Sequence, residues 1–336
     1  MNSSDIENIK AEFLKQNIRA KNFNIDTLPS DASMRVYERI THSDTTVMLM
    51  NASKELHSVE PFIKINELLE SKGYSVPHII AKDVKHGLLL LEDFGNNTYT
   101  KLLEDTKETK FEHDLYKKAV NVLIKLHKEK IDVPLHNHDQ NLLIKEVSLL
   151  IDWYFPTLND SPLSDELRSE FLSIWKNILS NINYDSSCLV LRDYHVDNIM
   201  LLDERIGVQS VGLLDFQDAV SGSYAYDLVS LLEDARRNLP KKLVSDMMHH
   251  YLDNMPNIDK QKFLMDYAIL GVQRSCKVVG IFSRKSVRDQ DNKYLIHLPR
   301  LWDYIRQGIN TPIMKPLKEW FSKIDAPIIR DRPNVD

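Results

Sequence analysis

The spacing of the glycines limits which nucleotide-binding folds this chain can adopt. Its 336 residues include nine glycines, at positions 73, 87, 95, 207, 212, 222, 271, 280 and 308. No two of them are separated by a single residue, so a G-x-G-x-x-G loop is impossible. Gly207 and Gly212 have the spacing of a Walker A loop, but two leucines follow where Lys and Ser or Thr are required. Any nucleotide site in this chain must therefore work without a glycine-rich cradle.

Charge and cysteine content exclude further classes of protein. Lys and Arg number 43 against 49 Asp and Glu, which gives a formal charge of −6 and no basic stripe for nucleic acid. Cys188 and Cys276 are too few for a disulfide scaffold, and no C-x-x-C is present for zinc. No apolar run approaches the roughly 18 residues of a membrane span, and residues 1–10 lack the pattern of a secretion signal. We therefore expect a cytoplasmic monomer that has free thiols and binds neither nucleic acid nor membrane.

Hydrophobic periodicity predicts a β-rich first part and a helical remainder. A helix is expected over 5–20, strands over 34–40, 46–50, 78–81 and 87–91, and a helix over 58–72 that stops at Gly73. From residue 98 the pattern is helical, interrupted by short strands over 187–191, 199–202 and 208–214. The further helices are expected over 111–129, 141–154, 163–182, 225–237, 241–253, 259–283 and 292–307. This pattern predicts an α+β chain with a small sheet-plus-helix lobe over 1–94 and a larger helical lobe over 95–336.

The densest polar cluster in an apolar neighbourhood lies between two of these short strands. It runs from Arg192 to Asn198 and contains Asp193 and His195; Asp215 follows 22 positions after Asp193. Asp193 can accept a proton from a hydroxyl nucleophile. Asn198 and Asp215 supply the hard oxygen ligands that Mg²⁺ prefers when it is shared with phosphate groups. Together these residues have the spacing of a phosphoryl-transfer site.

The same cluster has simpler interpretations. Asp and Asn dominate turns, so each acidic residue taken alone is more simply a turn or capping residue between strands. His195 and Asp197 alternate with no further His or Cys nearby, which is a poor pattern for zinc. No G-x-S-x-G is present, which excludes a nucleophile elbow. The joint spacing and strand context favour phosphoryl transfer over these alternatives.

The cluster resembles the catalytic loop of the protein-kinase-like superfamily, with Leu191 in place of the usual histidine. The form D-x-H-x-x-N is typical of the aminoglycoside phosphotransferase branch. The resemblance extends over nearly the whole chain and is closest to bacterial kinases that phosphorylate the anomeric hydroxyl of N-acetylmuramate and N-acetylglucosamine. The segments that carry it are Ser30-Asp31-Ala32-Ser33-x-Arg35-x-Tyr37, 89–95, 214–219 and 226–231. It implies a bilobal kinase-like fold.

The resemblance also implies roles for individual residues. Asp193 would be the catalytic base, with Arg192 beside it and His195 bracing the loop. Asn198 and Asp215 would hold Mg²⁺. Asp227 would be a structural acid that steadies the catalytic loop. The residues implied to contact ATP are Ser30, Asp31, Ala32 and Ser33 at the phosphates, Arg35 nearby, and the backbone of Glu92, Asp93 and Phe94 at the adenine.

The implied activity is ATP- and Mg²⁺-dependent transfer of the γ-phosphoryl group to an amino sugar, in the recycling of cell-wall sugars. Two alternatives remain open. One keeps the chemistry and changes the acceptor to an aminoglycoside, a choline-like or a homoserine-like compound. The other is a pseudokinase that binds ATP without turnover, because the strand over 46–50 lacks the lysine that kinases place on the phosphates. Either Arg35 or Lys54 could supply that missing charge, although a surface role is the simpler interpretation of each.

Overall fold

The computed structural model describes residues 3–18, 23–29, 34–43, 45–104, 106, 108–130, 133–159, 161–184 and 188–324. Its internal contacts divide the chain into two units that alternate along the sequence. Unit 1 comprises residues 1–119 and 196–219, and unit 2 comprises residues 120–195 and 220–336. The predicted lobes over 1–94 and 95–336 stay a prediction.

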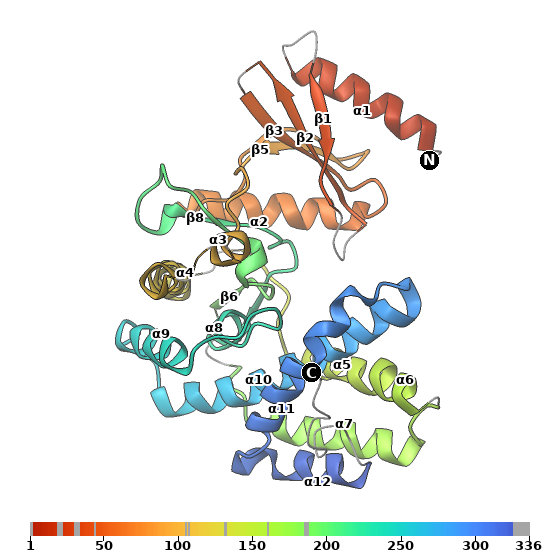
Figure 1. Ribbon diagram of the computed structural model, residues 1–336, viewed down its shortest axis with the longest axis vertical. Helices are drawn as coiled ribbons and strands as arrows, with labels where there is room; N and C mark the ends of the chain where they lie inside the picture. The colour runs from red at the N-terminus through yellow and green to blue at the C-terminus, as the bar shows by residue number, and fades with distance from the viewer. Residues whose placement is uncertain are drawn as a thin grey trace. The chain divides into compact units, whose positions relative to one another are not determined.

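Unit 1 contains a five-stranded antiparallel sheet in the order β1-β2-β3-β5-β4 (Figure 1). Alternation along each strand gives the sheet two different faces. Glu38 pairs with Leu49 and Ile40 with Val47, so these four side chains share one face. The strands are β1 (Asn24–Thr27), β2 (Val36–His42), β3 (Thr45–Asn51), β4 (Ile79–Asp83) and β5 (Leu88–Glu92).

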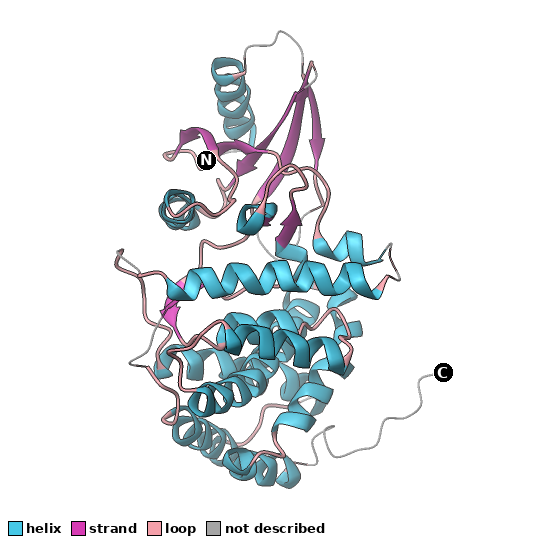
Figure 2. Cartoon of the chain, turned by 90° about the vertical axis from the view of Figure 1, so that its left-hand side faces the viewer, coloured by secondary structure: helices cyan, strands magenta, loops and turns pink. Residues whose placement is uncertain are grey.

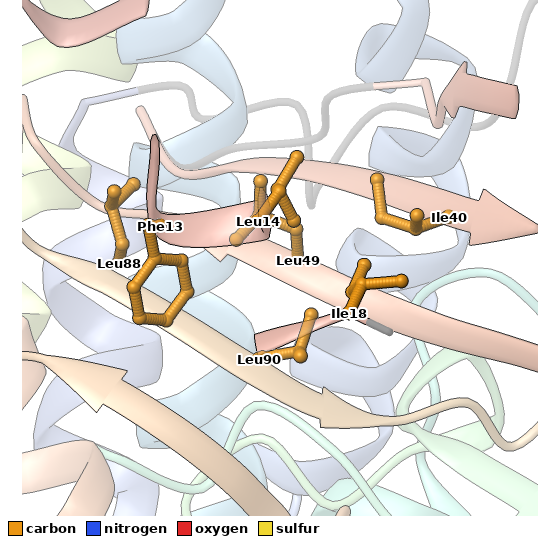
Figure 3. Close-up of a cluster of buried hydrophobic side chains, with 7 residues drawn as sticks. All are labelled: Phe13, Leu14, Ile18, Ile40, Leu49, Leu88 and Leu90. Carbon is orange, nitrogen blue, oxygen red and sulfur yellow. The ribbon is translucent and has the colours of Figure 1, made fainter. Parts of the chain in front are cut away.

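Helix α1 (Ser3–Asn17) packs on that face of the sheet. Apolar side chains from the helix segment meet those of β2, β3 and β5 in one cluster (Figure 3). A buried ion pair, Lys10 Nζ to Glu38 Oε1 at 3.0 Å, joins the helix to β2. Tyr37 and Arg39 alternate with these positions and therefore belong to the opposite face. The clustered residues are Phe13, Leu14, Ile18, Ile40, Leu49, Leu88 and Leu90.

The rest of unit 1 consists of three helices and a small ribbon. Helix α2 (Val59–Ser71) buries Phe62, whose ring stacks on Phe216 at a centroid distance of 5.1 Å. Helices α3 (Tyr99–Glu104) and α4 (Thr109–Lys128) follow the sheet, and α4 continues into unit 2. The ribbon pairs β7 (Ile199–Leu201) with β8 (Val211–Leu213), antiparallel. Short 3₁₀ turns occupy η1 (Leu56–Ser58), η3 (Val196–Asn198) and η4 (Gly207–Ser210).

Unit 2 is mostly helical, and the cyan ribbons of Figure 2 show how far helices predominate outside the sheet. Its elements pack around one long helix, α10 (Lys260–Asp289). This helix contacts α5 (Gln140–Leu149), α8 (Tyr226–Leu232) and α11 (Leu298–Gly308). Gly280 allows its close approach to α5, because a Cβ there would lie 2.3 Å from the carbonyl carbon of Leu149. The remaining elements are a π-helical turn (Leu150–Tyr154), α6 (Phe155–Asn159), α7 (Asp165–Leu179), β6 (Cys188–Val190), β9 (Val220–Gly222), α9 (Lys241–Asp253), η5 (Asn292–His297), η6 (Pro312–Met314) and α12 (Lys315–Lys323).

Most predicted elements are present, and the differences have local causes. The helix predicted over 225–237 ends at Leu232, because the Asp234 side chain accepts the Arg236 N–H and turns the chain. The strand predicted over 208–214 begins as the 3₁₀ turn η4. β1, α3, β9 and α12 were not predicted. Among the described residues, no helix combines the length and apolar character that crossing a bilayer requires.

Candidate functional site

The β7–β8 ribbon of unit 1 brings Asn198 and Asp215 to the same end. Ile199 pairs with Leu213, so the residue before β7 and the residues after β8 are neighbours. The Leu214 N–H donates to the carbonyl oxygen of Asn198 at 3.0 Å. Asp215 has a φ of 56°, in the left-handed region that Asp tolerates better than most residues. Strand pairing thus brings Asn198 close to Leu214 and Asp215, which follow it by 16 and 17 positions in sequence.

The carboxylate of Asp215 is held by two donors from unit 1. Arg35 donates from Nη2 to Oδ1 at 2.7 Å, across 180 residues of sequence. Gln217 donates from Nε2 to the same oxygen at 3.1 Å. The Asp215 side chain is still 39% exposed, so solvent and ligands reach it.

The donor chemistry of Asn198 and Asp215 fits Mg²⁺. An amide oxygen and a carboxylate at one end of a ribbon match the few protein ligands that Mg²⁺ takes when phosphates complete its shell. The described part of the chain holds no group of three or more His, Cys, Asp or Glu side chains that could enclose a metal by themselves. A metal shared with phosphate is therefore the kind of site these residues can form.

The segment Glu92–Phe94, predicted to contact adenine, is held by charged side chains. Arg39 donates from Nε and Nη2 to the two oxygens of Asp93 at 2.6 and 2.9 Å, and Asp93 also accepts the Gly95 N–H. Burial alone would raise the pKa of Asp93, but the Arg39 guanidinium and the Gly95 N–H hold it below its usual value. The Glu92 N–H donates to the His78 carbonyl. The Asp93 carboxylate therefore fixes the shape of this segment.

Phe94 packs on the β7–β8 ribbon. A Cβ at Gly212 would lie 2.8 Å from Cδ2 of Phe94, so only glycine leaves room for this ring. The Arg205 guanidinium lies over the same ring, 5.3 Å from its centroid, and Arg205 also pairs with Glu92. The β7–β8 ribbon and the predicted adenine segment, Glu92–Phe94, thus form one packed structure within unit 1. The predicted phosphate turn, Ser30, Asp31, Ala32 and Ser33, lies outside the described residues.

The first half of the predicted catalytic loop, up to His195, belongs to unit 2, and Asp227 braces it. The carboxylate of Asp227 accepts the backbone N–H of Leu191 at 2.6 Å and that of Arg192 at 2.9 Å. Asp227 is fully buried in α8, and burial raises its pKa to about 7 although the two N–H donors oppose the shift. Arg192 has a φ of 71°, a left-handed conformation that costs a non-glycine residue on the order of 1–3 kcal/mol. These two hydrogen bonds hold the strained turn that precedes Asp193.

Beneath the loop lies a buried charge cluster that the sequence did not reveal. Glu146 on α5 receives the Arg192 guanidinium on Oε1, and Lys277 on α10 approaches the same oxygen to 3.0 Å. His138 and Gln273 approach Oε2 at 3.2 and 3.3 Å. Burial alone would raise the pKa of Glu146, but Lys277, His138 and Arg192 hold it well below its usual range. A lysine inside the apolar run Cys276–Phe282 was the available signal for this cluster.

His195 occupies a buried, uncharged position in the loop. Burial lowers its pKa well below the usual value, and the nearby Arg236 and Arg274 lower it further. Its backbone N–H donates to the carbonyl oxygen of Asp193 at 3.1 Å. A neutral, enclosed imidazole fits a bracing role better than proton transfer.

The chain passes into unit 1 after His195, so Asp193 and Asn198 belong to different units although they are five residues apart in sequence.

Comparison with known proteins places this site in a family. The model of the phosphotransferase enzyme family matches residues 24–262, which is more than half of the chain. The chain belongs to the phosphotransferase enzyme family. As a member, it is an enzyme, and the family predicted from the sequence is confirmed.

Curated relatives of this phosphotransferase span most of its length. The N-acetylmuramate/N-acetylglucosamine kinase of Caulobacter vibrioides is 30% identical, over 96% of this chain and 97% of its own. The protein of the same name from Pseudomonas aeruginosa is 32% identical, over 83% and 82%. Each match covers more than four fifths of both chains, so it is not a shared fragment.

Solved structures support the predicted fold class. The choline kinase LicA of Streptococcus pneumoniae aligns with a TM-score of 0.63 at 14% identity, over 90% of this chain and 99% of its own. The ADP-bound aminoglycoside phosphotransferase APH(2'')-Ib aligns with a TM-score of 0.56 at 17% identity, over 90% and 97%. The α+β kinase-like fold, with its sheet early in the chain and helices after it, is therefore confirmed.

Proposed function

We propose that this phosphotransferase uses ATP and Mg²⁺ to phosphorylate the anomeric hydroxyl of N-acetylmuramate and N-acetylglucosamine, in the recycling of cell-wall sugars. The observation that carries the proposal is the similarity to four kinases named for these two sugars, at 30–32% identity over 83–96% of this chain. The solved aminoglycoside phosphotransferases and choline kinase are only 12–18% identical and support the fold alone.

Asp193 is the proposed general base. As the sugar hydroxyl oxygen bonds to the γ-phosphorus, its proton passes to the Asp193 carboxylate, and the bond from the γ-phosphorus to the bridging oxygen breaks to release ADP. The Asp227 hydrogen bonds and the Glu146–Arg192 ion pair keep the preceding turn in place. A fixed base contributes more than a mobile one because its orientation is determined before the reaction.

Asn198 and Asp215 are the proposed magnesium ligands. The ion, when bound, neutralises charge on the transferred phosphoryl group. The backbone of Glu92–Phe94 is the proposed contact for adenine, and residues 30–33 the proposed contact for the phosphates. In this proposal unit 1 carries the nucleotide and the metal, and unit 2 carries the base.

The test is a screen of acceptors with purified protein and MgATP. ADP release should depend on N-acetylmuramate or N-acetylglucosamine, and phosphorus NMR of the product should show an anomeric phosphate monoester. Choline, homoserine and an aminoglycoside serve as the competing acceptors. A higher kcat/KM for any of these three would overturn the sugar assignment, and no ADP release with any acceptor would favour the pseudokinase.

The assignment of the base is tested by Asp193→Asn. We expect kcat to fall by about 10²–10⁴-fold, the usual contribution of a positioned general base, while ADP binding and the unfolding temperature stay unchanged. Asp203→Asn is the matched control, since Asp203 is exposed in the loop between β7 and β8. Equal turnover by the wild type and Asp193→Asn would remove Asp193 from this role.

A further inference from the structure

The missing strand lysine leaves the phosphates of a nucleotide without their usual cation. Strand β3 reads Thr-Thr-Val-Met-Leu-Met-Asn and contains no basic residue. Two basic residues flank the β2–β3 pair: Arg35 immediately before β2 and Lys54 three residues after β3. The two side chains differ in how far they are exposed. Lys54 is exposed, whereas the Arg35 side chain is only 6% exposed.

Arg35 lies between two carboxylates of unit 1. Its Nη2 donates to Asp215 Oδ1 at 2.7 Å, and its Nε lies 3.7 Å from Glu55 Oε2. Burial alone would lower the pKa of the guanidinium, but Tyr37, Asp215 and Glu55 raise it, so Arg35 keeps its charge. Arg35 also interacts with Tyr37, which belongs to the sheet face opposite α1 because it alternates with Glu38 and Ile40 of β2. A charged side chain is thus fixed at the predicted metal ligand.

Arg35 occupies one of the two Asp215 oxygens through which this carboxylate could bind a metal. A cation bound at Oδ1 would compete with the guanidinium, because two positive charges in contact with one carboxylate oxygen repel each other. Glu55 offers Arg35 a second anionic partner when Asp215 turns to a metal. With a metal at Oδ1, that one oxygen would have two competing cationic partners, whereas Arg35 already has two anionic ones.

We propose that Arg35 is the counter-ion of the metal-binding carboxylate. In this role it holds Asp215 while no metal is bound, yields the Oδ1 oxygen when the magnesium nucleotide arrives, and then provides the phosphate charge that β3 lacks. This inference rests on the proposed function, since it takes Asp215 as the metal ligand and ATP as the donor. Arg35 is a positioning residue toward the metal and a binding residue toward the nucleotide. The arrangement links the two ligands, because the arrival of one cation releases the other.

The test measures the two affinities separately in the full-length protein. Mn²⁺ binding without nucleotide is followed by electron paramagnetic resonance, and ADP binding with Mg²⁺ by calorimetry. In Arg35→Gln we expect tighter Mn²⁺ binding and weaker ADP binding, each by a factor within the range of about 5–150 that is typical of coupled sites. Arg35→Lys, which keeps the charge without the planar fork, should lie between wild type and Arg35→Gln for both ligands. Lys54→Gln removes a nearby exposed charge and should change neither constant.

The opposite signs of the two effects distinguish this role from a structural one. Replacing a residue that only supports the fold would weaken the binding of both Mn²⁺ and ADP and would lower the unfolding temperature. Unchanged constants, or parallel weakening of both, would overturn the inference, and so would an equal effect of Lys54→Gln. Neither measurement requires a sugar. A wild-type protein that binds ADP but phosphorylates no amino sugar would therefore overturn the proposed function. The Arg35 prediction could still be tested on that protein.

Discussion

Replacing Glu146 by Gln should lower the free energy of unfolding, because Glu146 is the anion of the buried charge cluster with Arg192 and Lys277. Glu146 is a buried anion that pairs with both Arg192 and Lys277, and the three side chains are only 6%, 19% and 9% exposed. The substitution keeps the volume of the side chain and removes its charge. It takes the paired carboxylate away from two largely buried cations, and removing one partner of a buried ion pair typically costs about 3–5 kcal/mol.

The pH dependence of the same effect has a definite sign. The folded-state pKa of Glu146 lies well below its usual value of 4.5. The stability that Glu146 contributes is therefore fully present above about pH 4.5 and is lost as the pH falls through the folded-state value. The stability difference between wild type and Glu146→Gln should be largest near neutral pH and should shrink below about pH 4.5. At very low pH the two proteins should converge.

Urea unfolding followed by circular dichroism, repeated across pH, measures these differences. The partner variant Lys277→Met removes one of the two cations and should cost less than Glu146→Gln, because Arg192 and His138 still face the carboxylate. The double variant should cost less than the sum of the single variants, with a coupling of about 0.5–3 kcal/mol. A loss below about 1 kcal/mol in Glu146→Gln, or strict additivity in the double variant, would refute this reasoning.

Three further substitutions test other contacts. Asp227→Asn presents an NH₂ donor to one of the two backbone N–H groups it now accepts, so it should cost about 1–3 kcal/mol and reduce kcat; an unchanged urea midpoint would contradict the bracing role. Gly212→Ala places a Cβ 2.8 Å from Phe94 and should cost about 1–3 kcal/mol while weakening ADP binding in calorimetry; unaltered affinity would separate this ring from the nucleotide. Arg39→Met leaves the Asp93 carboxylate, 2% exposed, without its cation and should cost about 3–5 kcal/mol in thermal or urea unfolding; a neutral result would show that Asp93 is neutralised by other partners.

The parts of the fold that follow from local pattern could be predicted from the sequence. The strands β2, β3 and β5 carry the buried residues of the sheet, and α2 carries a regular apolar face that ends before Gly73. The candidate cluster stands out in the sequence because acidic and amide side chains interrupt short apolar strands. Strand pairing does bring Asn198 and Asp215 to one end of the ribbon, while the catalytic role of the cluster stays a prediction.

The missed features depend on pairing or on neighbours distant in sequence. β1 is an edge strand with four exposed residues, and β9 has three residues, so neither shows a hydrophobic period. The Arg35–Asp215 pair spans 180 residues, and the Glu146–Lys277 pair joins two helices. Both pairs consist of charged residues that look solvent-exposed until the elements around them are assembled. Long-range electrostatic contacts of this kind leave no periodic signal in the sequence.

The second segment of unit 1, residues 196–219, is synthesised later than the sheet with which it packs. The Leu213 N–H donates to the Ser75 carbonyl at 2.8 Å, and the Ser75 hydroxyl donates to the Gln209 carbonyl at 2.7 Å. These partners emerge only after residues 120–195, which are part of unit 2. At about 5–20 residues per second, that stretch alone occupies roughly 4–15 s. During this interval the N-terminal sheet is already synthesised, but the ribbon that carries Asn198 and Asp215 is not. A truncated chain ending at residue 119 would therefore lack both of these residues and the contacts that complete unit 1.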